Sequence, residues 1–323
     1  MPKVVFEGRE FQADANETIL ACLTRHGVSI DYSCKAGICQ TCLMAAVKGA
    51  PTEASQNGLK DALKARNYFL PCVCIPETDM EIARPDDNLV SEETTVNSLE
   101  PLNAEVIRLR LKRPANYSYY PGQFLNLHND QNISRSYSLA SLAEGDDFLE
   151  LHIRRVPGGK VSEWAHTRLA AGDKVRISQA SGDCFYLPGR PEQPLLLIGT
   201  GTGLAPLFGI LREALRQGHS GPIHLYHGSS TVDRLYLVET LTALAHDEGN
   251  IHYHPCVSRS EVPEGVGAGR ASDLALAEQG NLAGWRVFLC GREEMVKATK
   301  QRAFLAGASL QDIYADPFIP SLD

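Results

Sequence analysis

The alternation of apolar and polar residues changes along the chain, and it is clearest at the start. VVFEGREFQA alternates around Glu7-Gly8, a pattern typical of a β-hairpin. The next segment, ANETILACLTRHG, predicts a short helix with Asn16 as the N-cap and Gly27 as the stop signal. The chain is therefore expected to begin with a hairpin followed by a helix.

Two further strands and a linker complete the first part of the chain. CLMAAVKG and the segment 79–85 have the short apolar alternation of strands. The stretch 86–101 is acidic, polar and only weakly periodic. We expect it to be a linker, with a domain boundary near residue 95.

Short alternating stretches separated by turn residues fill the middle of the chain. They are AEVIRLRLK, GQFLNLHN, RSYSLAS, DFLELHIRRV and DKVRISQA. Their spacing predicts a small antiparallel barrel. One helix, KVSEWAHTRLAAG, is expected to interrupt it.

From residue 194 onward, apolar strands alternate with helical patterns. The predicted strands are 195–199, 223–228, 251–257, 286–291 and 312–316. Helical segments such as LAPLFGILREALRQG lie between them, and this alternation predicts a parallel sheet with crossover helices. The fold class is thus multidomain α+β and α/β, and the expected domains are 1–95, 96–190 and 191–323.

Composition excludes several classes of protein. The chain has 323 residues, of which 43% are hydrophobic and 22% charged, as in ordinary globular proteins. Its net charge of −8 argues against a nucleic-acid partner, because such proteins neutralise phosphates with basic residues. No apolar run approaches the roughly 20 residues that span a bilayer, so membrane insertion is not expected. The N-terminus lacks the apolar core of a signal peptide, which predicts a cytoplasmic protein.

Nine cysteines are unusual in a chain expected to stay in a reducing compartment, where disulfides are rare. Cys34, Cys39 and Cys42 form the pattern C-x4-C-x2-C, and Cys72 follows after a further 29 residues. This is the plant-type spacing of [2Fe–2S] ligands. A loop with three thiolates and a fourth thiolate from a distant segment can surround two irons.

Two alternatives stay open for these cysteines. A zinc site is the first, although zinc sites usually have paired short spacings. A zinc knot, or a redox sensor without iron, would make the first domain a binding module. The second alternative concerns the fourth ligand, because Cys74 is only two residues beyond Cys72. Cys22 is expected to pack on the apolar face of its helix.

The middle domain offers groups suited to a flavin nucleotide. Arg135-Ser136-Tyr137-Ser138 supplies a cation for a pyrophosphate, hydroxyls for the flavin edge and an aromatic plane for stacking. In the segment 158–162, Gly-Gly-Lys-Val-Ser, small residues precede a helix start whose free N–H groups can hold phosphate. An exposed strand can also show R-x-Y-S by chance, so the two segments are informative together.

The third domain opens with LLLIGTGTGLAP, in which Gly199, Gly201 and Gly203 follow a buried strand and begin a helix. Such a turn brings backbone donors close to a nucleotide pyrophosphate. The glycines alternate and do not form the strict G-x-G-x-x-G fingerprint, so a glycine-rich turn without a ligand is the alternative.

The choice between NADH and NADPH depends on the residues that face the adenosine ribose. NADPH usually requires an arginine or lysine on the 2′-phosphate. After the second strand of the sheet the chain reads HGSSTVDR, so that Ser229 and Ser230 take the first positions and Asp233 follows. Arg234 can still turn toward a 2′-phosphate. We favour NADH, with NADPH as the less favoured nucleotide.

These motifs together resemble the electron-transfer reductases of multicomponent oxygenases, in which a ferredoxin domain is joined to a ferredoxin–NAD(P) reductase module. YSCKAGICQTC and YFLPCVCIPETDMEI carry the ferredoxin resemblance, which places Cys72 as the fourth ligand. Gln40 stands where these ferredoxins usually have glycine. The resemblance implies a β-grasp ferredoxin domain, an antiparallel β-barrel for FAD and a Rossmann-like parallel sheet for the nucleotide.

The same resemblance assigns residues in the other two domains. In that superfamily the R-x-Y-S strand and the Gly-Gly-x-x-Ser helix start contact FAD, G-T-G-x-A-P and C-G-x-x-x-M line the nucleotide site, and a C-terminal aromatic covers the flavin. The matching residues are Arg135, Ser136, Tyr137, Ser138, Gly158, Gly159, Lys160, Val161, Ser162, Gly201, Thr202, Gly203, Ala205, Pro206, Cys290, Gly291, Met295 and Phe318. Ser138, near flavin N5, and Cys290, near the nicotinamide, are the predicted catalytic residues.

The three domains in this order predict an NADH-dependent flavin and iron–sulfur oxidoreductase. NADH delivers two electrons as hydride, a [2Fe–2S] cluster accepts one electron at a time, and FAD connects the two. The expected partner is an electron-accepting oxygenase component. A deoxysugar dehydratase is the alternative acceptor, because similar reductases serve both.

Overall fold

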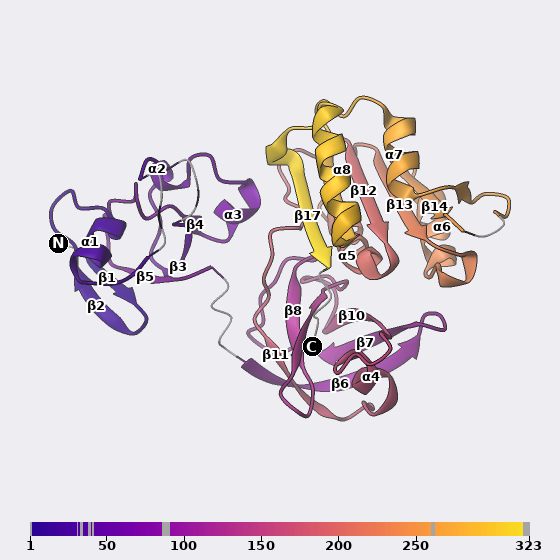
Figure 1. Cartoon of the computed structure of the whole chain (residues 1–323), viewed down its shortest axis with the longest axis horizontal. Coiled ribbons are helices and arrows are strands. Elements are labelled where there is room, and N and C mark those ends of the chain that lie inside the picture. The colour runs from indigo at the N-terminus through magenta and orange to yellow at the C-terminus, as the bar shows by residue number, and fades with distance from the viewer. Residues whose placement is uncertain are drawn as a thin grey trace. The chain divides into compact units, whose positions relative to one another are not determined.

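The computed structural model describes residues 2–30, 32, 35–37, 40, 42–85, 91–259 and 262–318. The chain folds as two compact units, Met1–Asp87 and Asn88–Asp323, and Figure 1 shows the elements of each. No helix within these described ranges is long and apolar enough to cross a membrane.

The first unit is built on a five-stranded mixed sheet in the order β2-β1-β5-β3-β4. β1 and β2 form the predicted hairpin, and β5 lies parallel to β1 on its other side, as a β-grasp fold requires. Its elements are β1 (Lys3–Phe6), β2 (Arg9–Gln12), α1 (Ile19–Arg25), β3 (Met44–Lys48), α2 (Glu53–Gln56), α3 (Asp61–Ala65), β4 (Tyr68–Phe69) and β5 (Met80–Ala83).

The first helix begins later than its sequence pattern suggests. Thr18, not Asn16, is the N-cap of α1, and its Oγ1 accepts a hydrogen bond from the Ala21 N–H at 3.2 Å. Asn16 instead adopts a left-handed φ of 61°, which asparagine tolerates in a turn. The prediction of Asn16 as N-cap was therefore wrong, whereas Gly27, with a φ of 76°, does follow the helix end.

The second unit opens with an antiparallel sheet of six strands in the order β10-β7-β6-β11-β8-β9. The backbone just beyond β9 pairs with β10 through Leu139 and Leu151, which closes the sheet into the predicted barrel. The elements are β6 (Ser91–Pro101), β7 (Val106–Lys112), β8 (Phe124–His128), β9 (Ser134–Ser138), β10 (Phe148–Arg154), α4 (Ser162–Thr167) and β11 (Lys174–Ser178).

The stretch 86–101 is not a linker throughout. From Ser91 it forms β6, the longest strand of the barrel, which pairs with both β7 and β11. Among the side chains described along this polar segment, those of Thr94 and Val96 are buried, so its alternation is faint. The strand begins ahead of the boundary that we expected near residue 95.

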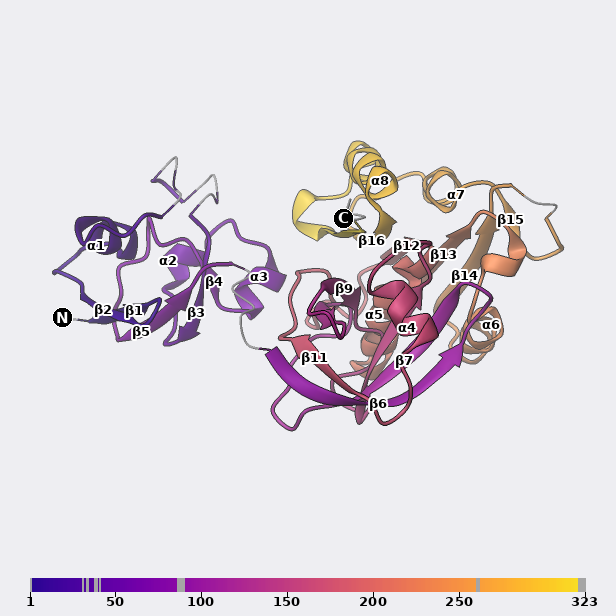
Figure 2. The same cartoon turned by 60° about the horizontal axis from the view of Figure 1, so that its bottom comes forward.

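The rest of the second unit is a sheet of six strands, all parallel, in the order β15-β14-β13-β12-β16-β17. Figures 1 and 2 show α7 and α8 on one face of this sheet and α5 and α6 on the other. The elements are β12 (Leu195–Thr200), α5 (Leu204–Arg216), β13 (Ile223–Ser229), α6 (Val238–Asp247), β14 (Ile251–Val257), β15 (Gly267–Ala268), α7 (Ala271–Gln279), β16 (Arg286–Arg292), α8 (Glu293–Leu305) and β17 (Ile313–Phe318), with short 3-10 turns η1 (Gly201–Gly203), η2 (Val232–Arg234) and η3 (Leu310–Asp312).

The barrel and the parallel sheet are packed closely through α5. A Cβ added at Gly209 on this helix would lie 2.8 Å from the Leu139 carbonyl oxygen of the barrel, so only glycine fits there without a shift. Leu139 directly follows β9. The close approach therefore places the R-x-Y-S strand beside the helix that follows the glycine turn.

Candidate active site

The glycine turn after β12 is held tightly against the end of β16. A Cβ added at Gly203 would lie 2.3 Å from the Cys290 carbonyl oxygen, and Gly201 has a left-handed φ of 56°. These two glycines let the turn lie on the neighbouring strand and lead directly into α5. The carboxyl ends of parallel strands and the start of the following helix are where such sheets bind nucleotides.

One polar atom in this turn has no partner among the residues that the structure describes. The Thr200 Oγ1 is buried and makes no hydrogen bond there. A Cβ added at Gly291 would lie 2.5 Å from the same oxygen, and Gly291 has a φ of 129°. A buried hydroxyl without a partner is costly. Its presence beside Gly201, Gly203 and Gly291, which together form the glycine cradle, fits a site that a polar ligand completes.

Ser138 and Cys290, the two predicted catalytic residues, are brought together through Asp316. The Ser138 hydroxyl donates to Asp316 Oδ2 at 2.8 Å. Asp316 lies opposite Cys290 in the register of β17 against β16. The pKa of the Asp316 carboxyl is raised to about 6. Burial is the largest cause; the hydrogen bond from Ser138 opposes it, and the charge of Asp183 adds to it. Sequence reasoning missed Asp316, although the predicted strand 312–316 contained it.

A second thiol lies beside Cys290. The Sγ atoms of Cys184 and Cys290 are 3.7 Å apart, and both side chains are buried. Burial, and then the contact with Cys184, raise the pKa of the Cys290 thiol well above its usual value. Cys290 is therefore a neutral thiol at the end of β16, suited to packing and weak hydrogen bonding rather than to nucleophilic attack.

The R-x-Y-S strand shows its residues in different surroundings along β9. Ser136 is exposed and donates to Asn126 Oδ1 at 2.7 Å, and Arg135 donates to the Ser134 carbonyl at 2.7 Å. Tyr137 packs against the barrel core, and burial raises the pKa of its phenol. The strand thus presents a cation and a hydroxyl near its start and the Ser138–Asp316 pair at its end.

The Gly-Gly-x-x-Ser segment forms a compact turn before α4. A Cβ added at Gly159 would lie 2.5 Å from the Ser162 Oγ, which accepts a hydrogen bond from the Val156 N–H at 3.2 Å. Val161 is a core side chain of the barrel, whereas Gly158 and Lys160 are exposed. The glycines and Lys160 can therefore face a phosphate, while Ser162 and Val161 shape the turn.

Ser229 is the last residue of β13, the strand that pairs with β12, and Ser230 follows it. Their carbonyl groups accept hydrogen bonds from the backbone of Ser258 and Arg259. Arg234 is already engaged here, because its Nη1 donates to Ser230 Oγ at 3.2 Å and its Nη2 to Glu105 Oε1 at 2.6 Å.

The remaining predicted nucleotide and flavin residues take up positions around these turns. Thr202 belongs to η1, and Ala205 and Pro206 are buried in the first turn of α5. Met295 packs against the core of the parallel sheet, so it supports the site from within the domain. Phe318 is the final residue of β17, directly opposite Arg292.

The ferredoxin unit brings two of the four predicted iron ligands together. Cys42 and Cys72 are buried and lie within hydrogen-bond reach of each other, and burial raises the pKa of the Cys42 thiol to about 11. Cys34 and Cys39 lie outside the described residues. All seven described cysteines of the chain are free thiols. A free thiol can become the thiolate ligand of iron, because the bound metal ion lowers the pKa of the thiol.

The surroundings of Cys72 and Cys74 differ. Cys72 lines a cavity of about 330 Å³ together with Lys35 and residues of α1. Cys74 is fully buried in the hydrophobic core of the unit, and its sulfur accepts from the Thr52 hydroxyl at 3.9 Å. These positions favour Cys72 as the ligand and a packing role for Cys74.

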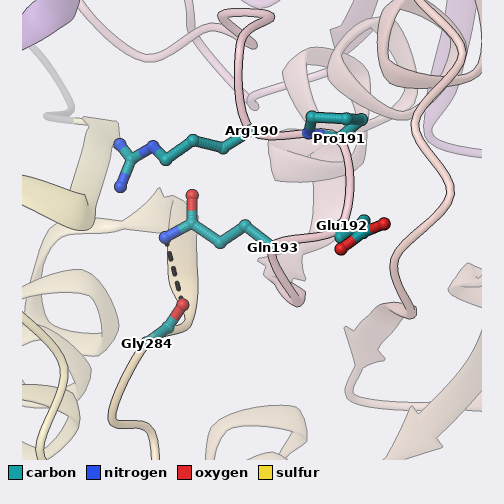
Figure 3. Close-up of a pocket in the computed structure, with 5 residues that line it drawn as sticks. All are labelled: Arg190, Pro191, Glu192, Gln193 and Gly284. Carbon is teal, nitrogen blue, oxygen red and sulfur yellow. Dashed lines mark hydrogen bonds between the residues drawn. The ribbon is translucent and has the colours of Figure 1, made fainter.

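A larger cavity, about 490 Å³, lies away from all of these groups. It is lined by Arg190, Pro191, Glu192, Gln193 and Gly284, next to the amino ends of β12 and β16 (Figure 3). The Gln193 side chain spans it and donates to the Gly284 carbonyl at 3.0 Å. Because nucleotides bind at the carboxyl ends of such strands, this cavity is not part of the nucleotide site.

Family models match each of the three domains. Residues 4–77 match a 2Fe-2S iron-sulfur cluster binding domain, residues 92–186 an oxidoreductase FAD-binding domain, and residues 197–301 an oxidoreductase NAD-binding domain. The ferredoxin–NAD(P)(+) reductase component of the naphthalene 1,2-dioxygenase system of Pseudomonas putida is 34% identical to this chain, over 96% of the chain and 95% of the relative. The chain belongs to this family of reductase components. The reductase is also 32% identical to the reductase subunit of the aromatic O-demethylase of Amycolatopsis, with 97% of each chain covered.

Solved structures agree with this membership. The crystal structure of the Amycolatopsis cytochrome P450 reductase GcoB matches the reductase with a TM-score of 0.69 and 30% identity, covering 99% of both chains. The predicted β-grasp, barrel and parallel-sheet domains are confirmed. The reductase is an oxidoreductase that uses a [2Fe–2S] cluster, FAD and NAD(P) to pass electrons to a partner.

The carboxyl of Asp316 gives the site a testable pH dependence. Above its pKa of about 6 the Asp316 carboxylate accepts a hydrogen bond from the Ser138 hydroxyl, and below that value the carboxyl is protonated and this hydrogen bond weakens. The rate of flavin reduction by NADH should therefore fall several-fold between about pH 8 and about pH 5. In D316N this fall in rate with pH should disappear, as measured by anaerobic stopped-flow absorbance of the flavin. A D316N profile that keeps this fall would show that another group titrates.

Proposed function

We propose that the reductase oxidises NADH in preference to NADPH and delivers the electrons, through FAD and the [2Fe–2S] cluster, to an oxygenase component. The relatives in P. putida and Amycolatopsis are named as reductase parts of a dioxygenase system and of an aromatic O-demethylase, and this supports an oxygenase as the acceptor. A deoxysugar dehydratase stays the alternative acceptor, and the cytoplasmic location stays a prediction.

The observation that carries the proposed transfer from nucleotide to FAD is the hydrogen bond from Ser138 to Asp316. It joins the last residue of the predicted flavin strand β9 to the carboxyl end of β17, beside Cys290. The barrel and the parallel sheet, the two lobes of the second unit, are therefore joined between the strand proposed for the flavin and a strand of the nucleotide sheet, which supports hydride transfer at this point. Reacting groups must approach within about 3.5 Å for such a transfer, so this convergence is what the chemistry needs.

Each cofactor has residues that suit it. Arg135, Ser136 and Lys160 would hold the FAD phosphates and edge, and Thr200 with the glycine cradle would hold the nicotinamide nucleotide. Cys72 and Cys42, with Cys34 and Cys39, would hold the iron. When bound, FAD accepts hydride from the nucleotide and passes on single electrons, which the cluster can carry.

Ser138 and Cys290 have separate proposed roles beside Asp316. Ser138 is buried and donates its hydroxyl hydrogen to Asp316, so its oxygen could accept a hydrogen bond from the N–H that the reduced flavin, but not the oxidised flavin, carries at N5. Cys290 is buried at the end of β16 as a neutral thiol, so it adds no charge beside Asp316.

The preference for NADH is supported by the state of Arg234. Both amino groups of its guanidinium are already committed, to Ser230 and to Glu105, so the cation is not set aside for a 2′-phosphate. Asp233, next to it, is exposed and adds a negative charge that a phosphate would meet.

Steady-state kinetics with both nucleotides test this proposal. With ferricyanide as the acceptor, kcat/KM for NADH should exceed that for NADPH by about tenfold or more, the factor expected when one charged contact is unfavourable. Cytochrome c, a one-electron acceptor, should show the same nucleotide preference. Equal values of kcat/KM for the two nucleotides would contradict the proposed preference.

A further inference from the structure

Arg234 and Glu105 form an ion pair that connects the two lobes of the second unit. Glu105 lies in the turn between β6 and β7 of the barrel, and Arg234 ends η2, just after β13 of the parallel sheet. The Arg234 Nη2 donates to Glu105 Oε1 at 2.6 Å, and the Nη1 donates to Ser230 Oγ at 3.2 Å. One guanidinium group therefore links the barrel carboxylate to the serine at the end of β13.

Backbone contacts fix both partners. The Asn103 Oδ1 accepts from the Glu105 N–H at 2.9 Å, and the Asn103 Nδ2 donates to the Arg234 carbonyl at 3.1 Å. The Arg155 N–H donates to the Glu105 carbonyl at 2.7 Å. The turn and η2 are thus held side by side independently of the ion pair, so the carboxylate stays in place when the arginine moves.

The pair lies at the end of the sheet where the adenosine ribose is expected. In folds of this kind the second strand ends beside the ribose, and an arginine there accommodates the 2′-phosphate of NADPH. Arg234 is the cation bound to Ser230 at this position, and Glu105 is the anion bound to that cation. A dianionic phosphate at the ribose would have to compete with the Glu105 carboxylate for the same guanidinium.

Stability is not a sufficient reason for this pair. The side chains of Arg234 and Glu105 are 48% and 37% exposed. Exposed ion pairs typically contribute well under about 1 kcal/mol to folding. The same charges matter far more to a bound phosphate, because a charged ligand group interacts directly with both.

We propose that Glu105 is a specificity-determining residue that selects NADH by holding Arg234 and by placing a carboxylate near the 2′ position of the ribose. This inference rests on the proposed function only in taking the end of β13 as the ribose site. A residue of the flavin barrel thereby takes part in the choice of pyridine nucleotide, and it does so from across the lobe boundary.

Kinetics of E105Q in the full-length holoenzyme test the proposal. Glutamine keeps the size of the side chain but removes its charge, so Arg234 is released to a phosphate. The ratio of kcat/KM for NADPH to that for NADH should rise about tenfold, the effect of one additional charge-assisted hydrogen bond. E144Q is the matched control, because Glu144 pairs with Arg216 at 2.8 Å on α5, away from β13, and its ratio should equal that of wild type.

Binding of adenosine 2′,5′-bisphosphate, compared with 5′-AMP, provides a readout that does not depend on turnover. In E105Q the bisphosphate should bind about tenfold more tightly by calorimetry, with 5′-AMP affected much less. The double variant E105Q/R234Q should lose this increase in affinity, because the released cation is then missing. An increase that persists in the double variant, or an E105Q ratio no different from that of E144Q, would overturn the proposal.

The outcomes separate this inference from the proposed function. The wild-type ratio for the two nucleotides tests the preference for NADH. The change from wild type to E105Q tests the role of Glu105, whatever the wild-type ratio is. A wild-type preference for NADH with no change in E105Q would leave the proposed function standing and remove the inference.

Discussion

Replacement of Cys72 with serine is expected to remove the [2Fe–2S] cluster and to lower NADH-driven reduction of cytochrome c by roughly 100-fold or more, because a cluster with three thiolates is poorly held. Cys72 lines the cavity beside Lys35 and lies within hydrogen-bond reach of Cys42. Reduction of ferricyanide, which can take electrons from the flavin directly, should be largely retained. Iron analysis and the two acceptor assays measure these effects.

C74S is the matched control for this experiment. Cys74 is two residues away, is fully buried and contacts Thr52 through its sulfur. Its replacement should lower the free energy of unfolding by about 1 kcal/mol while iron content and cytochrome c reduction stay close to wild type. Loss of iron in C74S with full iron in C72S would reverse the assignment of the fourth ligand.

Replacement of Gly203 with alanine should nearly abolish hydride transfer. The added Cβ would lie 2.3 Å from the Cys290 carbonyl oxygen, so η1 and the end of β16 must move apart. A displacement of about 1 Å in a reacting site can cost around 100-fold in rate. Overpacking should also lower the free energy of unfolding by about 1–3 kcal/mol. Stopped-flow reduction of the flavin by NADH measures the first effect, and denaturant unfolding the second.

G249A supplies the control. Gly249 has no left-handed φ and no neighbour within 4 Å of an added Cβ, so alanine is accommodated there. Flavin reduction in G249A should match wild type. If G203A reduced its flavin within twofold of the wild-type rate, the cradle formed by Gly203 and Cys290 would have no part in holding the nucleotide.

The sequence identified the motifs better than it identified the contacts between them. Glycines at fixed spacing, the R-x-Y-S strand and the cysteine pattern each depend on neighbours in the chain, so they can be recognised one by one. The position of Asp316 beside Cys290 depends on the register of β17 against β16. Glu105 depends on how the barrel meets the parallel sheet. Neither relation leaves a local signal.

The errors in secondary structure also have physical causes. Asn16 was a reasonable N-cap by residue type, but its left-handed φ places it in the preceding turn, and Thr18 makes the capping bond instead. β6 has few inward apolar residues, so its sequence lacks a clear strand pattern. It is nevertheless a strand because hydrogen bonds pair it with β7 on one edge and β11 on the other. Pairing of this kind is set by the tertiary structure, and a polar sequence can adopt it.

Electron paramagnetic resonance of the full-length protein, reduced anaerobically with NADH, tests most directly the claim that electrons pass from the nucleotide through the flavin to the cluster. One reduced [2Fe–2S] signal per chain should appear in the wild type and should be absent from C72S, although the flavin of both proteins is reduced. A wild-type protein with a full complement of iron and a reduced flavin, but without that signal, would contradict the account.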